Sequence, residues 1–324
     1  MMQVKKVENG AELIELLDKY GYSDFCSFCL YPNSYNKDGK KEDVSLTKDD
    51  IEKEDFADKI NVKDRIMFVG ENAAARDEDS QETQYTRFQM MHNQLSTRNN
   101  DYKLARLDNM DDENIKHSKA HGSLMCDFFI NIISTKLYGT KETIDKIENN
   151  LSIENIPNEY FDLHTVKDKE NLVDSNPTQK AYEKTKKIKA EIKVQKNILK
   201  QKINNSRQSN SKDIQRQVDQ IKLDINKNQQ LLKNKLIPKE KEEKSKLVEK
   251  LYQHAIKFDI PAFYFLTNAI KPTKIITFGE VAKRIVNILN RELQIGATIC
   301  PLKHFSYTMK DQDRQKEYDD AMNC

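Results

Sequence analysis

The chain has 324 residues, of which 37% are hydrophobic and 33% are charged, and its formal net charge is +2. This length allows one large domain or two modest ones. No run of about 18 apolar residues occurs, so we expect no membrane-spanning helix and no membrane partner. The N-terminus lacks the apolar stretch of a secretory signal, which predicts a cytoplasmic protein with five reduced cysteines.

Most of the chain outside residues 177–238 has the pattern of an α/β domain. The first 60 residues look mainly helical, with one helix expected from Ala11 to Leu17. Four short apolar runs are typical of buried strands, and helical spacing of apolar residues occurs between them. These runs are residues 65–69, 126–133, 274–279 and 295–300, the last of which we expect to stop at Pro301. The alternation predicts a three-layer α/β/α fold with a central, mostly parallel, four-stranded sheet.

A basic segment interrupts this α/β pattern. Residues 176–236 contain 16 Lys and Arg against 5 Asp and Glu, so they carry +11 and leave −9 for the rest of the chain. Apolar residues recur at helical spacing in two stretches, which the turn-forming run Asn204–Ser211 separates. They are Ile188, Ile192, Leu199 and Ile203 in the first stretch, and Ile214, Val218, Ile221, Ile225 and Leu232 in the second. The pattern predicts an antiparallel, coiled-coil-like helical hairpin over residues 177–238, inserted into the α/β domain.

This predicted hairpin has three possible roles. Its lysines can form a solvated face with no partner. They can instead bind phosphate groups, because clustered lysines release counterions from nucleic acid. In the third interpretation the exposed seam contacts a second copy of the chain or docks another protein. The sequence leaves the three roles open.

Polar side chains follow the first and the last of the predicted strands. Gly70, Glu71 and Asn72 come directly after the first strand, and His304 and Ser306 follow the last one. In open α/β sheets, ligands bind beyond the carboxyl ends of the strands. We therefore expect the functional site at this edge of the sheet.

The order of these motifs resembles the uracil-DNA glycosylase superfamily. Members of that family have Gly-x-Asn-Pro-Gly, Gly-Glu-Ala-Pro-Gly or Gly-Gln-Asp-Pro after the first strand, and His-Pro-Ser after the last core strand. The corresponding runs here are Gly70–Ala74 and His304–Ser306. Leu266–Ala282 is also similar to the family, with a lysine-proline, a strand, a glycine and a short helix. The resemblance covers residues 63–133 and 252–307 and omits the hairpin.

The resemblance implies catalytic roles for three residues. Asn72 matches the residue that orients or activates water, and Glu71 matches the acidic residue of one branch of the family. His304 matches the histidine that stabilises the negative charge developing on the departing base. A carboxylate can act as a base and stabilise an oxocarbenium-like sugar, whereas an amide orients the water.

Five further residues would bind the substrate under the same resemblance. Ser306 would bind a neighbouring phosphate, and Asp127 lies near the position that reads the base edge. Phe88 would stack on a base extruded from the double helix. Gly70 and Ala73 belong to the first motif and complete the predicted binding set.

We expect neither a cofactor nor a metal ion. Cys26 and Cys29 have the Cys-x-x-Cys spacing that one branch of the family uses for an iron–sulfur cluster. The other cysteines, Cys126, Cys300 and Cys324, lack the neighbouring spacing of that branch. The two thiols are therefore expected to be buried hydrophobic residues.

The sequence thus predicts a protein that removes a damaged or modified base from DNA by hydrolysing the N-glycosidic bond. The expected organisation is a helical extension (1–60), a glycosylase-like domain in two parts (61–176 and 239–324) and the hairpin (177–238) between them. One alternative is a catalytically divergent protein that binds nucleic acid or a nucleotide, with the hairpin docking a partner or a second subunit. Two observations favour it: the acidic stretch Asp77–Glu82 would repel phosphate, and the motifs are altered. Ala73–Ala74 replaces the family's Pro-Gly, and Phe305 replaces the Pro of its His-Pro-Ser. The other alternative is an enzyme acting on a free nucleotide or nucleoside.

Overall fold

We describe a computed structural model of the chain, in which two compact units are present. Unit 1 comprises residues 1–135, 140–173 and 251–324, and unit 2 comprises residues 136–139 and 174–250. The structure describes residues 4–24, 26–29, 52–71, 122–128, 132–133, 138–161, 173–174, 176–206, 212–303 and 311–324. None of the helices in these ranges is both long and apolar enough to cross a membrane.

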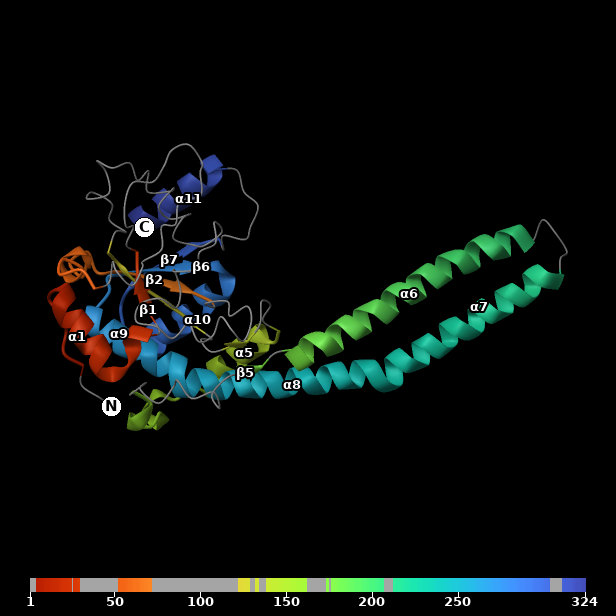
Figure 1. Ribbon diagram of the computed structural model, residues 1–324, viewed down its shortest axis with the longest axis horizontal. Coiled ribbons are helices and arrows are strands. Elements are labelled where there is room, and N and C mark those ends of the chain that lie inside the picture. The colour runs from red at the N-terminus through yellow and green to blue at the C-terminus, as the bar shows by residue number, and fades with distance from the viewer. Residues whose placement is uncertain are drawn as a thin grey trace. The chain divides into compact units, whose positions relative to one another are not determined.

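Unit 1 is built on a mixed sheet, which confirms the predicted α/β class (Figure 1). In the described ranges the sheet has five strands in the order β1-β3-β2-β6-β7. Strands β3, β2, β6 and β7 run parallel, and β1 pairs antiparallel with β3 at one edge. The bounds are Cys26–Phe28 for β1, Ile66–Gly70 for β2, Leu124–Asp127 for β3, Lys274–Phe278 for β6 and Thr298–Leu302 for β7.

The sheet differs from the predicted four-stranded one in two places. The additional strand β1 lies in the segment that we expected to be helical. It was not predicted because three residues are too few to show the alternation of a strand. The predicted strand 126–133 is also divided, since β3 ends at Asp127 and Ile132–Ile133 forms the separate strand β4. A further two-residue strand, β5, spans Val173–Asp174.

Strand β7 continues through Pro301 rather than stopping before it as predicted. Pro301 is the register partner of Thr277 in β6, and the strand ends at Leu302. β7 lies at the edge of the sheet, where a residue without an N–H group is tolerated. The prediction was therefore wrong about the end of the strand, because strand order decides whether a proline can be accommodated.

Helices and buried side chains cover the centre of the sheet. All five residues of β2 are buried, and successive side chains of a strand point to opposite faces, so both faces of β2 are covered. α10 (Gly279–Glu292) contacts β2, β6 and β7, and α11 (Asp311–Asn323) contacts β7. Phe68 of β2 and Phe278 of β6 stack with their ring centroids 5.8 Å apart.

The other helices of unit 1 are short. α1 (Gly10–Tyr20) begins where Asn9 accepts a hydrogen bond from the amide of Glu12, and ends at Gly21 with φ of 78°. α5 spans Thr140–Asn150, α9 spans Ile260–Ile270, and the 3-10 turns η1, η2, η4 and η5 span Tyr22–Asp24, Ala57–Lys59, Ile153–Asn155 and Asn158–Phe161. Arg284 of α10 contacts Asp145 and Glu148 of α5 at 2.7 and 2.8 Å.

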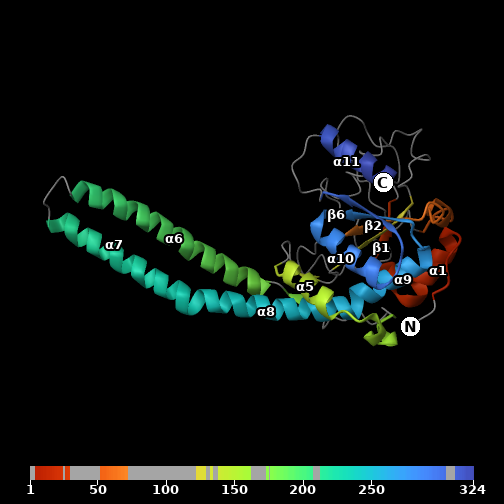
Figure 2. The same cartoon turned by 180° about the vertical axis from the view of Figure 1, so that it is seen from behind.

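Unit 2 contains two long helices that lie side by side, α6 (Asn176–Ser206) and α7 (Lys212–Leu231), as Figures 1 and 2 show. Their apolar contact consists of Ile192, Ile225 and Leu232, with Ile188, Leu199, Ile221, Leu236 and Ile237 packed against them. Asn228 donates a hydrogen bond to Gln195 at 3.3 Å, and Lys202 donates one to Gln217. Because the later residue of α6 contacts the earlier residue of α7, the two helices are antiparallel.

Two π-helical turns interrupt the helical run from residue 212 to 270. η8 (Leu232–Leu236) precedes α8 (Ile237–His254), and η9 (Ala255–Asp259) precedes α9. The residue after each turn donates its amide to the carbonyl five residues earlier. Pro238 and Pro261 come next. A proline inside a helix lacks an N–H and clashes with the carbonyl four residues earlier, and the wider turn relieves this clash.

The cysteines differ in part from the prediction that all five are reduced. Cys300 of β7 and Cys324, directly after α11, form a disulfide. The prediction failed for this pair because α11 packs along β7 and brings together residues 24 apart in sequence. Cys26, Cys29 and Cys126 are buried and form no disulfide.

Candidate functional site at the carboxyl edge of the sheet

The strand order of unit 1 creates a topological switch point between β2 and β6. β2 is followed in the sheet by β3 on one side, whereas β6 is followed by β7 on the other side. After β2 the chain continues to one side of the sheet, and after β6 it continues to the other side. Open α/β sheets bind ligands at such a point, beyond the carboxyl ends of the two strands. The candidate site accordingly lies beyond the ends of β2 and β6, at Gly70 and Phe278.

Glu71 is the first residue after β2 and lies at this switch point. It is partly buried, and burial raises the pKa of its carboxyl above the ordinary value of 4.5. Desolvation is the cause, because the charged form of a carboxylate is disfavoured away from water. A carboxyl with a raised pKa at a ligand-binding edge has the properties of a general base or acid.

The structure brings Gly70, Glu71 and Asp127 to the same edge. Gly70 and Asp127 are register partners in the parallel pair of β2 and β3. The carbonyl of Gly70 also accepts a hydrogen bond from the amide of Phe128 at 3.2 Å. Backbone pairing places Gly70 beside Asp127, and Glu71 follows Gly70 directly, so three of the eight predicted site residues lie at this edge. For Asp127 the structure describes the backbone alone.

The N-terminus of α10 is a further element at the switch point. α10 begins at Gly279, directly after β6, and Gly279 has φ of 86°, which favours glycine. Phe278 at the N-cap provides no side-chain hydrogen bond to the first amides of the helix. Helix N-termini favour negative charge, so this end can stabilise an anionic group of a ligand. The apolar spacing in the sequence predicts the helix, but it does not indicate that the first turn lies at the switch point.

A buried hydroxyl lies close to the same edge. Thr277, one residue before the end of β6, is fully buried, and its hydroxyl has no hydrogen-bond partner among the described residues. Its register partner is Val69 of β2, so the two side chains share one face of the sheet. The sequence places Thr277 in an apolar strand and does not show that its hydroxyl is buried, because that burial depends on the tertiary structure.

Five predicted site residues lie outside the described part of the chain. They are Asn72, Ala73, Phe88, His304 and Ser306. The residue before His304 is described, and there Lys303 contacts Glu317 of α11 at 3.3 Å through its Nζ. The amide of Lys303 is also hydrogen-bonded to the Glu317 carboxylate, which fixes the end of β7 against α11.

A buried histidine–aspartate pair occurs elsewhere in unit 1. The Nδ1 atom of His254 lies 3.1 Å from an Asp259 carboxylate oxygen, and both side chains are almost fully buried. Among the described residues, His254 Nε2 and the second Asp259 oxygen have no hydrogen-bond partner. The ring of His254 packs edge-on against Phe258 at a centroid distance of 5.0 Å. The pair was not predicted and no described contact connects it to the sheet edge.

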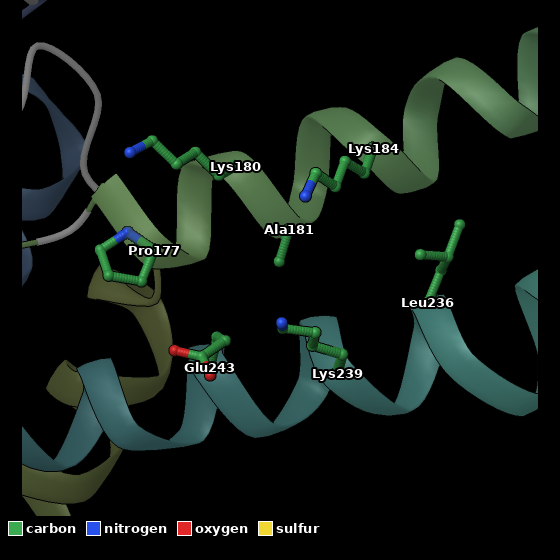
Figure 3. A pocket seen from close by; sticks show the side chains of 7 residues that line it. All are labelled: Pro177, Lys180, Ala181, Lys184, Leu236, Lys239 and Glu243. Carbon is green, nitrogen blue, oxygen red and sulfur yellow. The ribbon is translucent and has the colours of Figure 1, made fainter.

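Unit 2 contains a cavity of about 220 Å³ at the start of α6 (Figure 3). It is lined by Pro177, Lys180, Ala181, Lys184, Leu236, Lys239 and Glu243. Lys239 extends from α8 toward Ala181 of α6 in Figure 3. The carboxylate of Glu243 lies 3.5 Å from Lys246, so the cavity is basic in character. Its three lysines are exposed, and Glu243 is partly buried.

Comparisons with known proteins complete the description of the site. No protein-family model, no curated protein and no solved structure matches this chain. Over the described ranges, no cluster of three or more His, Cys, Asp and Glu residues is arranged to hold a metal ion. The functional proposal is therefore built on the strand-end geometry and on the motifs in the sequence.

Proposed function

We propose that this chain hydrolyses the N-glycosidic bond of a damaged or modified base in DNA, with Glu71 as the catalytic carboxylate. The observation that carries the proposal is the position of Glu71. It follows β2 at the switch point between the parallel strands β2 and β6, and burial raises its pKa. The motifs that resemble the uracil-DNA glycosylase superfamily support the same edge and the same residue.

The reaction needs a base and a stabiliser of positive charge. A water oxygen forms a bond to the anomeric carbon of the sugar, and the bond from that carbon to the base nitrogen breaks. The base leaves with the electron pair of that bond, and the Glu71 carboxylate accepts the proton of the water. A raised pKa makes Glu71 a stronger base near neutral pH, and its charge stabilises the oxocarbenium-like sugar.

The remaining groups have roles that the family resemblance suggests. Asn72 orients the attacking water, and His304 donates a hydrogen bond to the departing base. The substrate-binding residues are Gly70, Ala73, Phe88, Asp127 and Ser306. The N-terminus of α10 supplies amides that favour negative charge next to the switch point.

The test is base release from uracil-, hypoxanthine- and xanthine-containing oligonucleotides, single- and double-stranded. We expect release by the unaltered protein and a loss of about 100-fold or more for Glu71→Gln, the usual range for a general base. The rate of the unaltered protein should rise as Glu71 loses its proton, at a pH above 4.5 because its pKa is raised. Glu71→Gln should lack that rise.

The matched control is Glu154→Gln, which removes an exposed carboxylate of η4 in the same unit. It should leave both the rate and the pH profile unchanged. Circular dichroism of each variant shows whether it is folded. Equal release by the unaltered protein and Glu71→Gln would contradict the role of Glu71, and no release by folded protein on any substrate would contradict the activity itself.

A second candidate function is nucleic-acid binding without base release. The observation in its favour is that α6 carries 9 lysines and 2 glutamates, a net charge of +7. The replacements at Ala73–Ala74 and Phe305 also favour a site that binds without catalysis. Duplex binding that weakens steeply with salt, together with no base release, is the result that would select this function.

A further inference from the structure

Five lysines of α6 form a regular exposed row, which we call the lysine stripe. Its members alternate at spacings of three and four residues, and all five side chains are exposed. They are Lys186, Lys189, Lys193, Lys196 and Lys200. Residues three and four apart in an α-helix lie on the same face, so the stripe follows one side of α6. At 1.5 Å per residue it is about 21 Å long.

No ion pair neutralises the lysine stripe within the described part of the chain. The neighbouring helices differ in this respect. On α7, Arg216 lies 3.8 Å from Asp213 and Lys222 lies 3.6 Å from Asp219. On α8, Lys246 lies 2.6 Å from Glu242. The positive charge of unit 2 that lacks acidic partners is therefore concentrated on α6.

The two acidic residues of α6 do not offset the stripe. Glu183 lies before the stripe, three positions from Lys186; it accepts a hydrogen bond from Gln179 at 3.0 Å and, among the described residues, forms no ion pair with Lys186. Glu191 is two positions from both Lys189 and Lys193, a spacing that does not bring helix side chains together. The row consequently presents five ammonium groups to solvent with no carboxylate inserted among them.

We propose that the lysine stripe binds the phosphate backbone of a nucleic acid without reading its sequence. A duplex carries about one charge per 1.7 Å of its axis, so a row about 21 Å long faces many phosphates. Lysine is suited to this task because its ammonium group contacts phosphates as a point charge. The choice of nucleic acid over other polyanions rests on the proposed function.

The structure favours nucleic acid over an anionic membrane. A helix that lies on a membrane needs an apolar face to insert beside its basic face. Three large apolar side chains of α6, Ile188, Ile192 and Leu199, are instead packed in the contact with α7 and η8. The exposed large apolar residues of α6 are Val194 and Ile198, four positions apart, which make a much shorter apolar face than a helix lying on a membrane needs.

The experiment measures binding of the full chain to an undamaged duplex oligonucleotide by fluorescence anisotropy, from 50 to 200 mM salt. Five phosphate contacts predict a slope of about −4.5 in log affinity against log salt, or about a 500-fold loss over this range. The stripe variant replaces Lys186, Lys189, Lys193, Lys196 and Lys200 by Gln. It should bind about 100-fold more weakly at 50 mM salt, with a slope shallower by about 4.5.

A matched variant removes the same charge from other parts of unit 2, by Gln at Lys187, Lys212, Lys227, Lys235 and Lys250. We expect it to lose less than tenfold in affinity and to keep most of the salt slope. Circular dichroism of both variants should show unchanged helix content. If both sets of substitutions weaken duplex binding equally, the proposed role of the lysine stripe would be overturned, because binding would then depend on net charge alone.

Failure of the stripe and failure of the glycosylase proposal give different results. Duplex binding that depends on the stripe, without base release, would contradict only the glycosylase activity. If the unaltered protein releases the base, and the unaltered protein and the stripe variant bind duplex equally well, only the proposed role of the lysine stripe would be contradicted. Preferential binding of the unaltered protein to vesicles with anionic lipids, with no binding to duplex, would overturn the choice of nucleic acid.

Discussion

Glu71 shows how one residue acquires a chemical role from its surroundings. Its identity and its place after a buried strand are evident from the sequence. The raised pKa comes from burial at the end of β2, which the sequence alone does not specify. An identical glutamate in full contact with water would lack this shift, because water stabilises the charged form.

The pairing of His254 with Asp259 depends on the π-helical turn η9. In a regular α-helix, each residue advances by about 100°, so side chains five positions apart point in different directions. The wider turn of η9 brings them to the same side, with 3.1 Å between the interacting atoms. The sequence alone would place these two residues on different faces of a helix.

We expect this pair to contribute to stability as a unit. Asp259→Leu should lower the free energy of unfolding by about 1–3 kcal/mol, because it leaves the buried Nδ1 of His254 without its partner. The double variant His254→Phe/Asp259→Leu should recover much of that loss, since neither polar group remains buried. Denaturant unfolding of the two single variants and the double variant measures the coupling. Additive losses would show that the two side chains do not stabilise each other.

At the scale of elements, the long helices of unit 2 are held together by a narrow apolar contact. Ile225 of α7 is only 6% exposed in this contact, whereas Leu223, two positions away on the same helix, is 61% exposed. The seven-residue spacing of Val218, Ile225 and Leu232 predicts which residues pack together. It does not predict η8, where a proline changes the helical register.

The difference in burial leads to a prediction for α7. Ile225→Ala should destabilise unit 2 by about 2–5 kcal/mol, because it removes buried methyl groups and leaves a cavity. Amide hydrogen exchange in α6 and α7 should become about thirtyfold faster or more. Leu223→Ala is the control on the same helix and should change stability by no more than about 0.5 kcal/mol. Similar effects of the two substitutions would argue against the α6–α7 contact.

At the scale of the whole molecule, the chain combines two units with separate cores. The core of unit 1 surrounds the sheet, and that of unit 2 lies between α6 and the helices that follow it. The division between the units falls between Lys250 and Leu251, within α8. Composition changes near residue 238, but the helix continues beyond it.

Separate cores predict two thermal transitions in scanning calorimetry. Ile276→Ala, in the fully buried part of β6, should lower the midpoint of the unit 1 transition by roughly 5 °C or more. Ile225→Ala should lower only the midpoint of the unit 2 transition. A single transition that both substitutions shift would show that the units unfold as one.

The sequence by itself determined the α/β class, the basic helical segment and the position of Glu71 at a strand end. These features depend on local periodicity and charge, which neighbouring residues specify. The tertiary structure decided the added strand β1, the passage of β7 through Pro301, the Cys300–Cys324 disulfide and the His254–Asp259 contact. Most of these depend on which distant segments pack together, and the last on a π-helical turn. Neither periodicity nor composition encodes such effects locally.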